Sequence, residues 1–155
     1  MKKNRHRKHA FVLLILYLVL LTYYLFFAEA MGRTPDSRTE YSYNLVLFKE
    51  IKRFIVHRDI LGNKAVALNL AGNVVAFMPF GFILPEVWDQ LNKWYTITIL
   101  GFLFSLGIEI AQLTARVGSF DVDDLLLNTI GALIGYVAFV IAKGVWKNYC
   151  GENRK

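Results

Sequence analysis

Three short series of polar residues lie in or beside apolar stretches of this chain, and these are the residues that could do chemistry. Within each series the members follow one another at intervals of three or four residues, so they share one face of a helix. Together they offer carboxylates, amides and a guanidinium, which can bind a polar headgroup or transfer a proton. The predicted ligand-binding residues are Asn69, Asn73, Glu109, Gln112, Arg116, Asp121, Asp124 and Asn128.

Glu109 has the most unusual position of these residues. It lies five residues before the end of its apolar stretch, which is about 7–8 Å along a helix that rises 1.5 Å per residue. An unpaired carboxylate at such a depth costs about 3 kcal/mol or more. We therefore expect Glu109 to pair with donors such as Asn69, Asn73 and Arg116, or to face a wet cavity. No catalytic residue is established by the sequence, and Glu109 is the candidate if the chain is an enzyme.

The acidic cluster formed by Asp121, Asp123 and Asp124 has two interpretations. The carboxylates could bind Mg²⁺ or Ca²⁺, or one of them could cap a helix while the others pair with Arg116 or water. The spacing matches neither a calcium-binding loop nor a zinc-protease motif. We therefore predict no metal and no cofactor.

The composition indicates that membrane helices position these residues. Of 155 residues, 55% are hydrophobic and only 19% are charged, with a mean hydropathy of +0.39. A helix of about 20 residues crosses the hydrocarbon core of a bilayer. We predict an all-α, integral membrane four-helix bundle, and the single cysteine excludes an internal disulfide framework. The four apolar stretches are residues 10–28, 65–84, 96–114 and 125–142.

The polar residues also lie at matching depths. The Asn69–Asn73 pair opens the second stretch, Glu109 and Gln112 close the third, and Asn128 lies near the start of the fourth. Successive membrane helices run in opposite directions, so these ends meet at one membrane surface. The sequence therefore predicts that the three polar series converge.

The orientation follows from the distribution of Lys and Arg. With both termini cytoplasmic, that side carries ten Lys and Arg residues against eight on the other, and five of the ten lie in the first eight residues. The polar series then face outward. A cleaved signal peptide ending near residues 28–30 is the less favoured alternative, because signal sequences have apolar cores of about 7–15 residues.

The first external loop contains an amphipathic pattern over residues 44–61, with basic residues around an apolar face. We predict a helix lying in the membrane interface, which either covers the bundle or recognises lipid headgroups. A G-x-x-x-G motif, at Gly131 and Gly135, predicts close helix packing within the bundle rather than dimerisation.

Taken in order, the polar motifs resemble those of the VanZ-like family. They are N-x-x-G-N followed by F-x-P-x-G at 69–81, S-x-x-x-E-x-x-Q at 105–112, and D-x-x-D-x-x-x-N-x-x-G-x-x-x-G at 121–135. The resemblance divides the chain into a basic N-terminus, first helix and loop (1–43), a VanZ-like domain (44–142) and a cytoplasmic tail (143–155). It implies a multi-pass bacterial membrane protein, and the founding member is associated with low-level teicoplanin resistance. The family supplies no reaction.

Three functions are compatible with these observations. The first is an envelope protein whose outer polar cavity binds an amphiphile or lipid-linked headgroup. The alternative is an intramembrane enzyme on a lipid or polyprenyl-linked substrate, with Glu109 as acid or base. An oligomeric transporter or channel is the weakest. We expect membrane lipids as partners, with a lipid-linked cell-wall precursor, a lipoglycopeptide or a second copy of the chain as further candidates, and no nucleic acid.

Overall fold

The computed structural model describes residues 2–27 and 41–152, so the candidate cleavage site at 28–30 lies outside the described residues. Its main elements are four helices that are each long and apolar enough to cross a membrane. They confirm the predicted all-α bundle, and each helix extends beyond its apolar stretch at one end at least. The four are α1 (Lys2–Phe27), α4 (Asn63–Val87), α5 (Trp94–Thr114) and α6 (Val122–Glu152).

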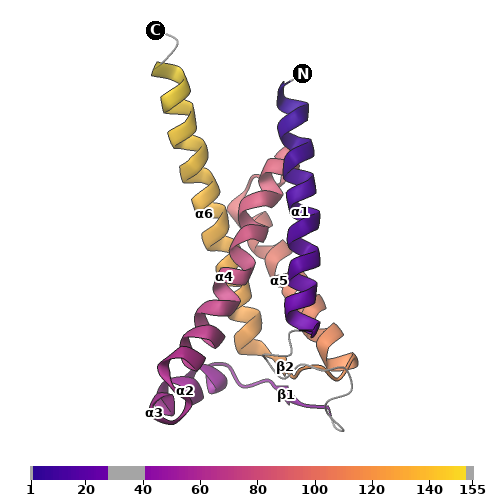
Figure 1. The fold of residues 1–155 in the computed structure, drawn as a ribbon, viewed down its shortest axis with the longest axis vertical. Coiled ribbons are helices and arrows are strands. Elements are labelled where there is room, and N and C mark those ends of the chain that lie inside the picture. Colours follow the sequence, from indigo (N-terminus) through magenta and orange to yellow (C-terminus); the bar gives the residue numbers. More distant parts are fainter. Residues whose placement is uncertain (1, 28–40, 153–155) are drawn as a thin grey trace.

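The four helices alternate in direction, so the bundle has two distinct ends (Figure 1). The first and last described residues lie at the same end, here called the terminal end, together with the short 3-10 helix η2 (Asp89–Leu91) between α4 and α5. The opposite end, here called the polar end, holds α2 (Lys49–Val56), α3 (Arg58–Leu61), β1 (Tyr43–Asn44) and β2 (Phe120–Asp121).

Helices α4 and α6 form the closest contact of the bundle, and small residues make it possible. A Cβ atom built on Gly131 would lie 2.2 Å from the carbonyl oxygen of Val74, and one on Gly135 would lie 2.0 Å from that of Met78. Only glycine fits such an approach of two backbones. The G-x-x-x-G motif therefore packs within the bundle, as predicted.

The interior is apolar except where the polar series enter it. Phe77 and Ile97 are fully buried, and the rings of Phe80 and Phe104 stack with centroids 4.9 Å apart. Many large apolar residues on the outer faces of the helices are exposed, including Leu20 at 67%. In a membrane protein these outer faces are the surface that contacts lipid.

The amphipathic pattern at 44–61 forms less helix than predicted. Asn44 belongs instead to β1, which pairs in parallel with β2, and helix α2 begins only at Lys49. Phe48 has a left-handed backbone with φ 65° immediately before the helix, and a break at His57 separates α2 from α3. The predicted start at residue 44 was wrong for two reasons. Asn44 is extended and pairs with β2, and the left-handed backbone of Phe48 does not fit a right-handed helix. We call residues 43–61 the surface segment.

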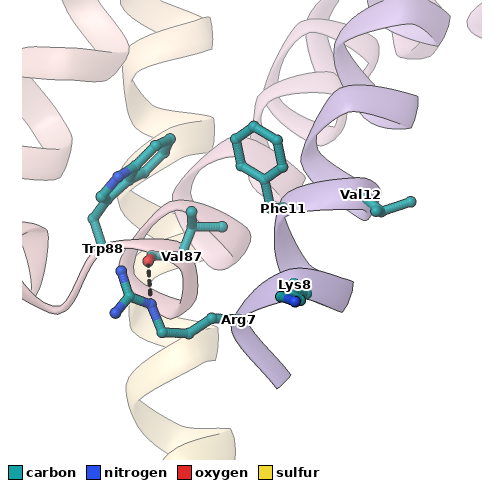
Figure 2. A pocket seen from close by; sticks show the side chains of 6 residues that line it. All are labelled: Arg7, Lys8, Phe11, Val12, Val87 and Trp88. Atoms are coloured by element: carbon teal, nitrogen blue, oxygen red, sulfur yellow. Dashed lines mark hydrogen bonds between the residues drawn. The ribbon is translucent and has the colours of Figure 1, made fainter. Parts of the chain in front are cut away.

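At the terminal end, α1 docks against the end of α4. The Nε atom of Arg7 donates a hydrogen bond of 3.0 Å to the carbonyl oxygen of Val87 (Figure 2). Farther along α1, the hydroxyl of Tyr17 donates to the carbonyl oxygen of Ala76 at 2.9 Å. These bonds fix α1 beside α4 at two levels of the bundle.

Candidate functional site

The polar residues predicted to converge do meet at the polar end. The side-chain amide of Asn73 on α4 donates to the carboxylate of Asp124 on α6. An oxygen of Glu109 on α5 accepts the backbone N–H of Asp121 at 2.9 Å. The convergence is therefore found, while the role of these residues in binding a ligand stays a prediction.

Glu109 is almost completely buried, at 2% exposure, on the same face of α5 as Ser105 and Gln112. We predicted Arg116 as one of its partners. The guanidinium of Arg116 lies 5.2 Å from the centre of the Tyr41 ring, whereas Glu109 accepts the N–H of Asp121. The carboxylate thus joins the end of α5 to the loop that enters α6.

Asp121 is the cap of α6. Its Oδ1 atom accepts the backbone N–H of Asp123 at 2.8 Å, two residues on, as an N-cap residue does. The same atom accepts the amide of Asn44 at 3.1 Å. Burial raises the pKa of the Asp121 carboxyl. The Asp121 carboxyl therefore binds a proton more readily in the folded protein than in the unfolded chain. Its contribution to stability decreases as the pH rises from the pKa of the unfolded chain through the higher pKa of the folded protein.

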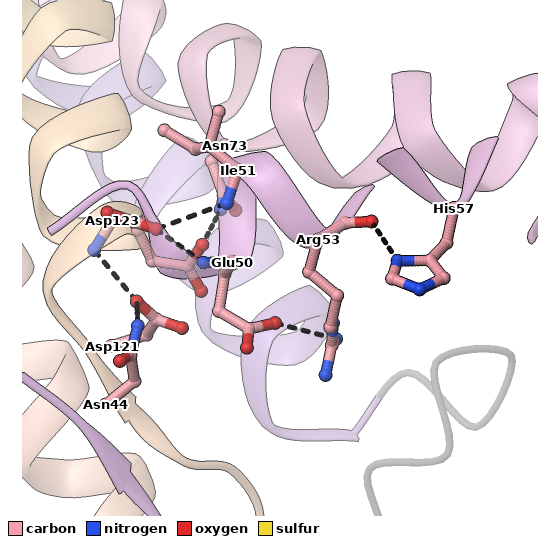
Figure 3. Close-up of polar contacts among 9 residues, drawn as sticks. Asn44, Glu50, Ile51, Arg53, His57, Asn73, Asp121 and Asp123 are labelled. Atoms are coloured by element: carbon pink, nitrogen blue, oxygen red, sulfur yellow. Dashed lines mark hydrogen bonds and ion pairs between the residues drawn. The ribbon is translucent and has the colours of Figure 1, made fainter. Parts of the chain in front are cut away.

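The Asp123 carboxylate accepts three backbone N–H groups, and the helical spacing did not select this residue. One carboxylate oxygen accepts the N–H of Phe48, and the other accepts those of Glu50 at 2.9 Å and Ile51 at 3.2 Å (Figure 3). The side chain is 1% exposed. Asp123 therefore supplies, from another part of the chain, the acceptor that the first turn of α2 needs.

Asn44 is the second residue that sequence reasoning missed as part of the site. Besides donating to Asp121, its side-chain oxygen accepts the N–H of Val46 at 3.2 Å. No signal in the sequence pointed to Asn44. For Asp123 the signal was negative, because Phe48, which precedes α2, has no side-chain acceptor for the helix N-terminus. A missing cap indicates that an acceptor comes from elsewhere, without saying from where.

Two of the remaining predicted residues, Gln112 and Asn128, join helices to one another. The amide of Gln112 donates to the carbonyl oxygen of Leu25 on α1 at 2.9 Å. The amide of Asn128 donates to the hydroxyl of Ser105 at 2.9 Å, while its buried carbonyl oxygen has no hydrogen-bond partner among the described residues. Asn69 lies half-buried on α4, one turn before Asn73. All the predicted residues thus lie in the polar half of the bundle.

The acidic cluster does not form a metal centre in the described part of the chain. Residues 2–27 and 41–152 contain no group of three or more His, Cys, Asp and Glu side chains placed to hold an ion. The physical reason is that the oxygens of Asp121 and Asp123 point to N–H donors of the protein itself.

The fold and the polar end define a small membrane protein with four helices long and apolar enough to cross a membrane, and a network of buried polar side chains at one end of the bundle. More specifically, the chain belongs to the VanZ/LLP1 family, whose model matches residues 13–143. The match includes most of α1, whereas the polar motifs that carry the resemblance in the sequence all lie on the later helices. No curated protein and no solved structure matches the chain.

Proposed function

We propose that this VanZ/LLP1 protein acts in the bacterial cell envelope by binding an amphiphile or a lipid-linked headgroup at its polar end. The binding contributes to resistance against the lipoglycopeptide teicoplanin, which carries a fatty acyl tail. Both termini are cytoplasmic in this proposal, so the polar end faces outward. The buried carboxylates hold the surface segment in place, and the surface segment contacts the ligand.

The observation that carries this proposal is the anchoring of α2 by Asp123. Three backbone N–H groups at the start of α2 converge on one buried carboxylate. A helix of 8 residues is too short to be stable in water on its own. Its fixed attachment therefore presents its side chains to the membrane surface in one arrangement.

Those side chains suit an amphiphile. Lys49 and Lys52 are exposed cations, while Ile55 at 51%, Val56 at 71% and Ile60 at 83% are exposed apolar residues. Cations attract the anionic headgroups at a membrane surface, and apolar side chains insert beside acyl chains. An amphiphile offers both kinds of partner in one molecule.

The test measures the inhibitory concentration of teicoplanin in a susceptible Gram-positive host that expresses the chain. We expect the wild-type chain to raise this concentration and the Lys49→Gln/Lys52→Gln variant to return it to the level of an empty vector. Lys143→Gln/Lys147→Gln is the matched control, because it removes the same charge from α6 at the terminal end. A blot checks that the wild-type chain and the variants are compared at equal levels in the membrane. Loss of the effect in both double variants, or no effect of the wild type, would contradict the proposal.

The orientation has its own test, since Cys150 is the single cysteine of the chain. A membrane-impermeant maleimide should label Cys150 only after the cells are permeabilised. Labelling in intact cells would place the C-terminus outside and the polar end inside, and the proposed contact with an external antibiotic would then fail.

The enzymatic alternative uses Glu109 as acid or base, and its geometry gives less support. One oxygen of Glu109 already accepts a backbone N–H, and the side chain is 2% exposed. Glu109→Gln separates the two functions, because an amide keeps an acceptor oxygen but cannot act as a general acid or base near neutral pH. We expect Glu109→Gln to retain the teicoplanin effect at equal abundance. Loss of that effect, with binding of teicoplanin to the purified protein preserved, would favour an enzyme.

A further inference from the structure

A second candidate binding site lies at the terminal end, far from the polar residues. A cavity of about 440 Å³ opens between the start of α1 and the end of α4 (Figure 2). This volume is within the range of about 300–1,000 Å³ that is usual for small-ligand sites. Its lining combines cationic and apolar side chains, namely Arg7, Lys8, Phe11, Val12, Val87 and Trp88.

The cationic part of the cavity is oriented before any ligand arrives. The bond from Arg7 Nε to the carbonyl oxygen of Val87 fixes the plane of the guanidinium. That carbonyl is available because α4 ends at Val87. The two Nη groups, which form the fork that matches phosphate oxygens, are separate from this bond. Lys8 adds a second exposed cation beside the cavity.

The apolar part of the lining comes from the next turn of α1 and from the end of α4. Phe11 and Val12 follow Arg7 along α1 and are 46% and 55% exposed. The rings of Phe11 and Trp88 meet edge to face with centroids 6.3 Å apart (Figure 2). Tryptophan is enriched at the level of lipid headgroups, where its ring contacts acyl chains and its N–H remains near polar groups.

The charge around the cavity favours an anion. The first eight residues of the chain contain five Lys and Arg residues and no acidic residue. Glu86 and Asp89 flank the Val87–Trp88 pair in sequence, but neither lines the cavity. A ligand with a negative head and an apolar tail therefore complements the two parts of the lining.

We propose that this cavity binds one anionic phospholipid, with its phosphate on Arg7 and Lys8 and an acyl chain along Phe11, Val12 and Trp88. The site is separate from the proposed function, because it lies at the opposite end of the bundle. It would hold α1 against α4 at the membrane surface through a lipid as well as through the Arg7–Val87 bond.

The test reads lipid binding at Trp88 itself. In a Trp94→Phe/Trp146→Phe background, Trp88 is the single tryptophan of the full-length protein. The protein is placed in nanodiscs of unlabelled phosphatidylcholine with a small fraction of brominated phosphatidylglycerol or brominated phosphatidylcholine, since bromine quenches a neighbouring indole. We expect stronger quenching by the phosphatidylglycerol. Arg7→Gln should reduce this preference about fivefold, the effect of removing one cation near an anionic headgroup.

Lys147→Gln is the matched control, because it removes one exposed positive charge from α6 at the same end without changing the cavity. It should keep the preference, whereas Lys8→Gln, which leaves the Arg7–Val87 bond intact, should weaken it. Circular dichroism and gel filtration check that each variant is folded. Equal quenching by the two lipids, or an equal loss in the Lys8→Gln and Lys147→Gln variants, would overturn the proposal. A loss of quenching on adding inorganic phosphate, at constant ionic strength, would indicate a free-anion site and would also overturn it.

Discussion

The buried carboxylates of the polar end and the exposed cations at the start of α1 have opposite uses. At the polar end, Asp123 and Glu109 are buried at 1% and 2% exposure, and their oxygens accept backbone N–H groups of the same chain. At the terminal end, Arg7 and Lys8 are exposed beside an open cavity. The first arrangement joins segments of the protein to one another, and the second leaves charge accessible to other molecules.

This difference shows that a charged residue near a membrane is not by itself evidence of a ligand site. A carboxylate with a short side chain that is drawn into the bundle must find donors there, and the nearest donors are backbone amides. A long cationic side chain can instead extend toward the headgroups. Ligands are therefore to be sought on exposed cations, such as those of α2 and of the start of α1.

Removal of the Asp123 carboxylate is the strongest test of this comparison. Asp123→Ala leaves the N–H groups of Phe48, Glu50 and Ile51 without their acceptor, so we expect a loss of about 3–5 kcal/mol in the free energy of unfolding. Unfolding in mixed micelles measures it, and hydrogen exchange should accelerate in α2 first. Asp59→Ala, on a side chain that is 90% exposed in α3, should cost less than about 0.5 kcal/mol. Equal losses would show that Asp123 is no anchor.

The glycine contact packs α6 against α4 between the two ends of the bundle. Disrupting it should give the next largest loss in the free energy of unfolding. Gly135→Ala places a Cβ atom 2.0 Å from the backbone oxygen of Met78, so the helices must separate, at a cost of about 1–3 kcal/mol. Gly144→Ala, on the same helix, would place its Cβ more than 4 Å from every described atom outside the local helix backbone, and should stabilise by about 0.5–1 kcal/mol through helix propensity. The same unfolding assay compares them, and stabilisation by both would disprove the close contact.

The bundle and the convergence of its polar residues could be predicted because both depend on periodicity within single helices. The length of each apolar stretch predicted a span, and the alternation of spans placed Glu109, Asn73 and Asp124 at one end. Helix packing at Gly131 and Gly135 followed from the spacing of two small residues. These features need no knowledge of which segments meet across the chain.

The connection between the surface segment and α6 could not be predicted in this way. Asp123 and Phe48 are 75 residues apart, and no repeat or spacing joins them. The β1–β2 ladder has 2 residues in each strand, too few for an alternating pattern. Asp123 also lies off the helical face shared by Asp121, Asp124 and Asn128, so the rule that found the other site residues passed over it.

Glu109→Gln refines the comparison at the polar end. The amide keeps an acceptor for the N–H of Asp121 but loses the charge, and a charge-assisted hydrogen bond is about twice as strong as a neutral one. We expect a loss of about 1 kcal/mol in the free energy of unfolding. Glu86→Gln, an exposed carboxylate in α4, serves as the control and should change it by less than about 0.5 kcal/mol. A loss of several kcal/mol at Glu109 would mean that the charge itself, rather than an acceptor, holds this end together.

Arg7→Gln should have the smallest effect on folding, and it addresses the other half of the comparison. The variant loses the bond to Val87 at the exposed end of α1, so we expect a loss of about 0.5–1 kcal/mol in the free energy of unfolding. Lys147→Gln, measured in the same assay, gives the baseline for removing an exposed cation. If Arg7→Gln instead lowers the free energy of unfolding as much as Asp123→Ala does, charged residues stabilise the fold at both ends of the bundle. A small cost would show that the exposed guanidinium is not needed for folding, and the preference of Trp88 for anionic lipid then tests its role in lipid binding.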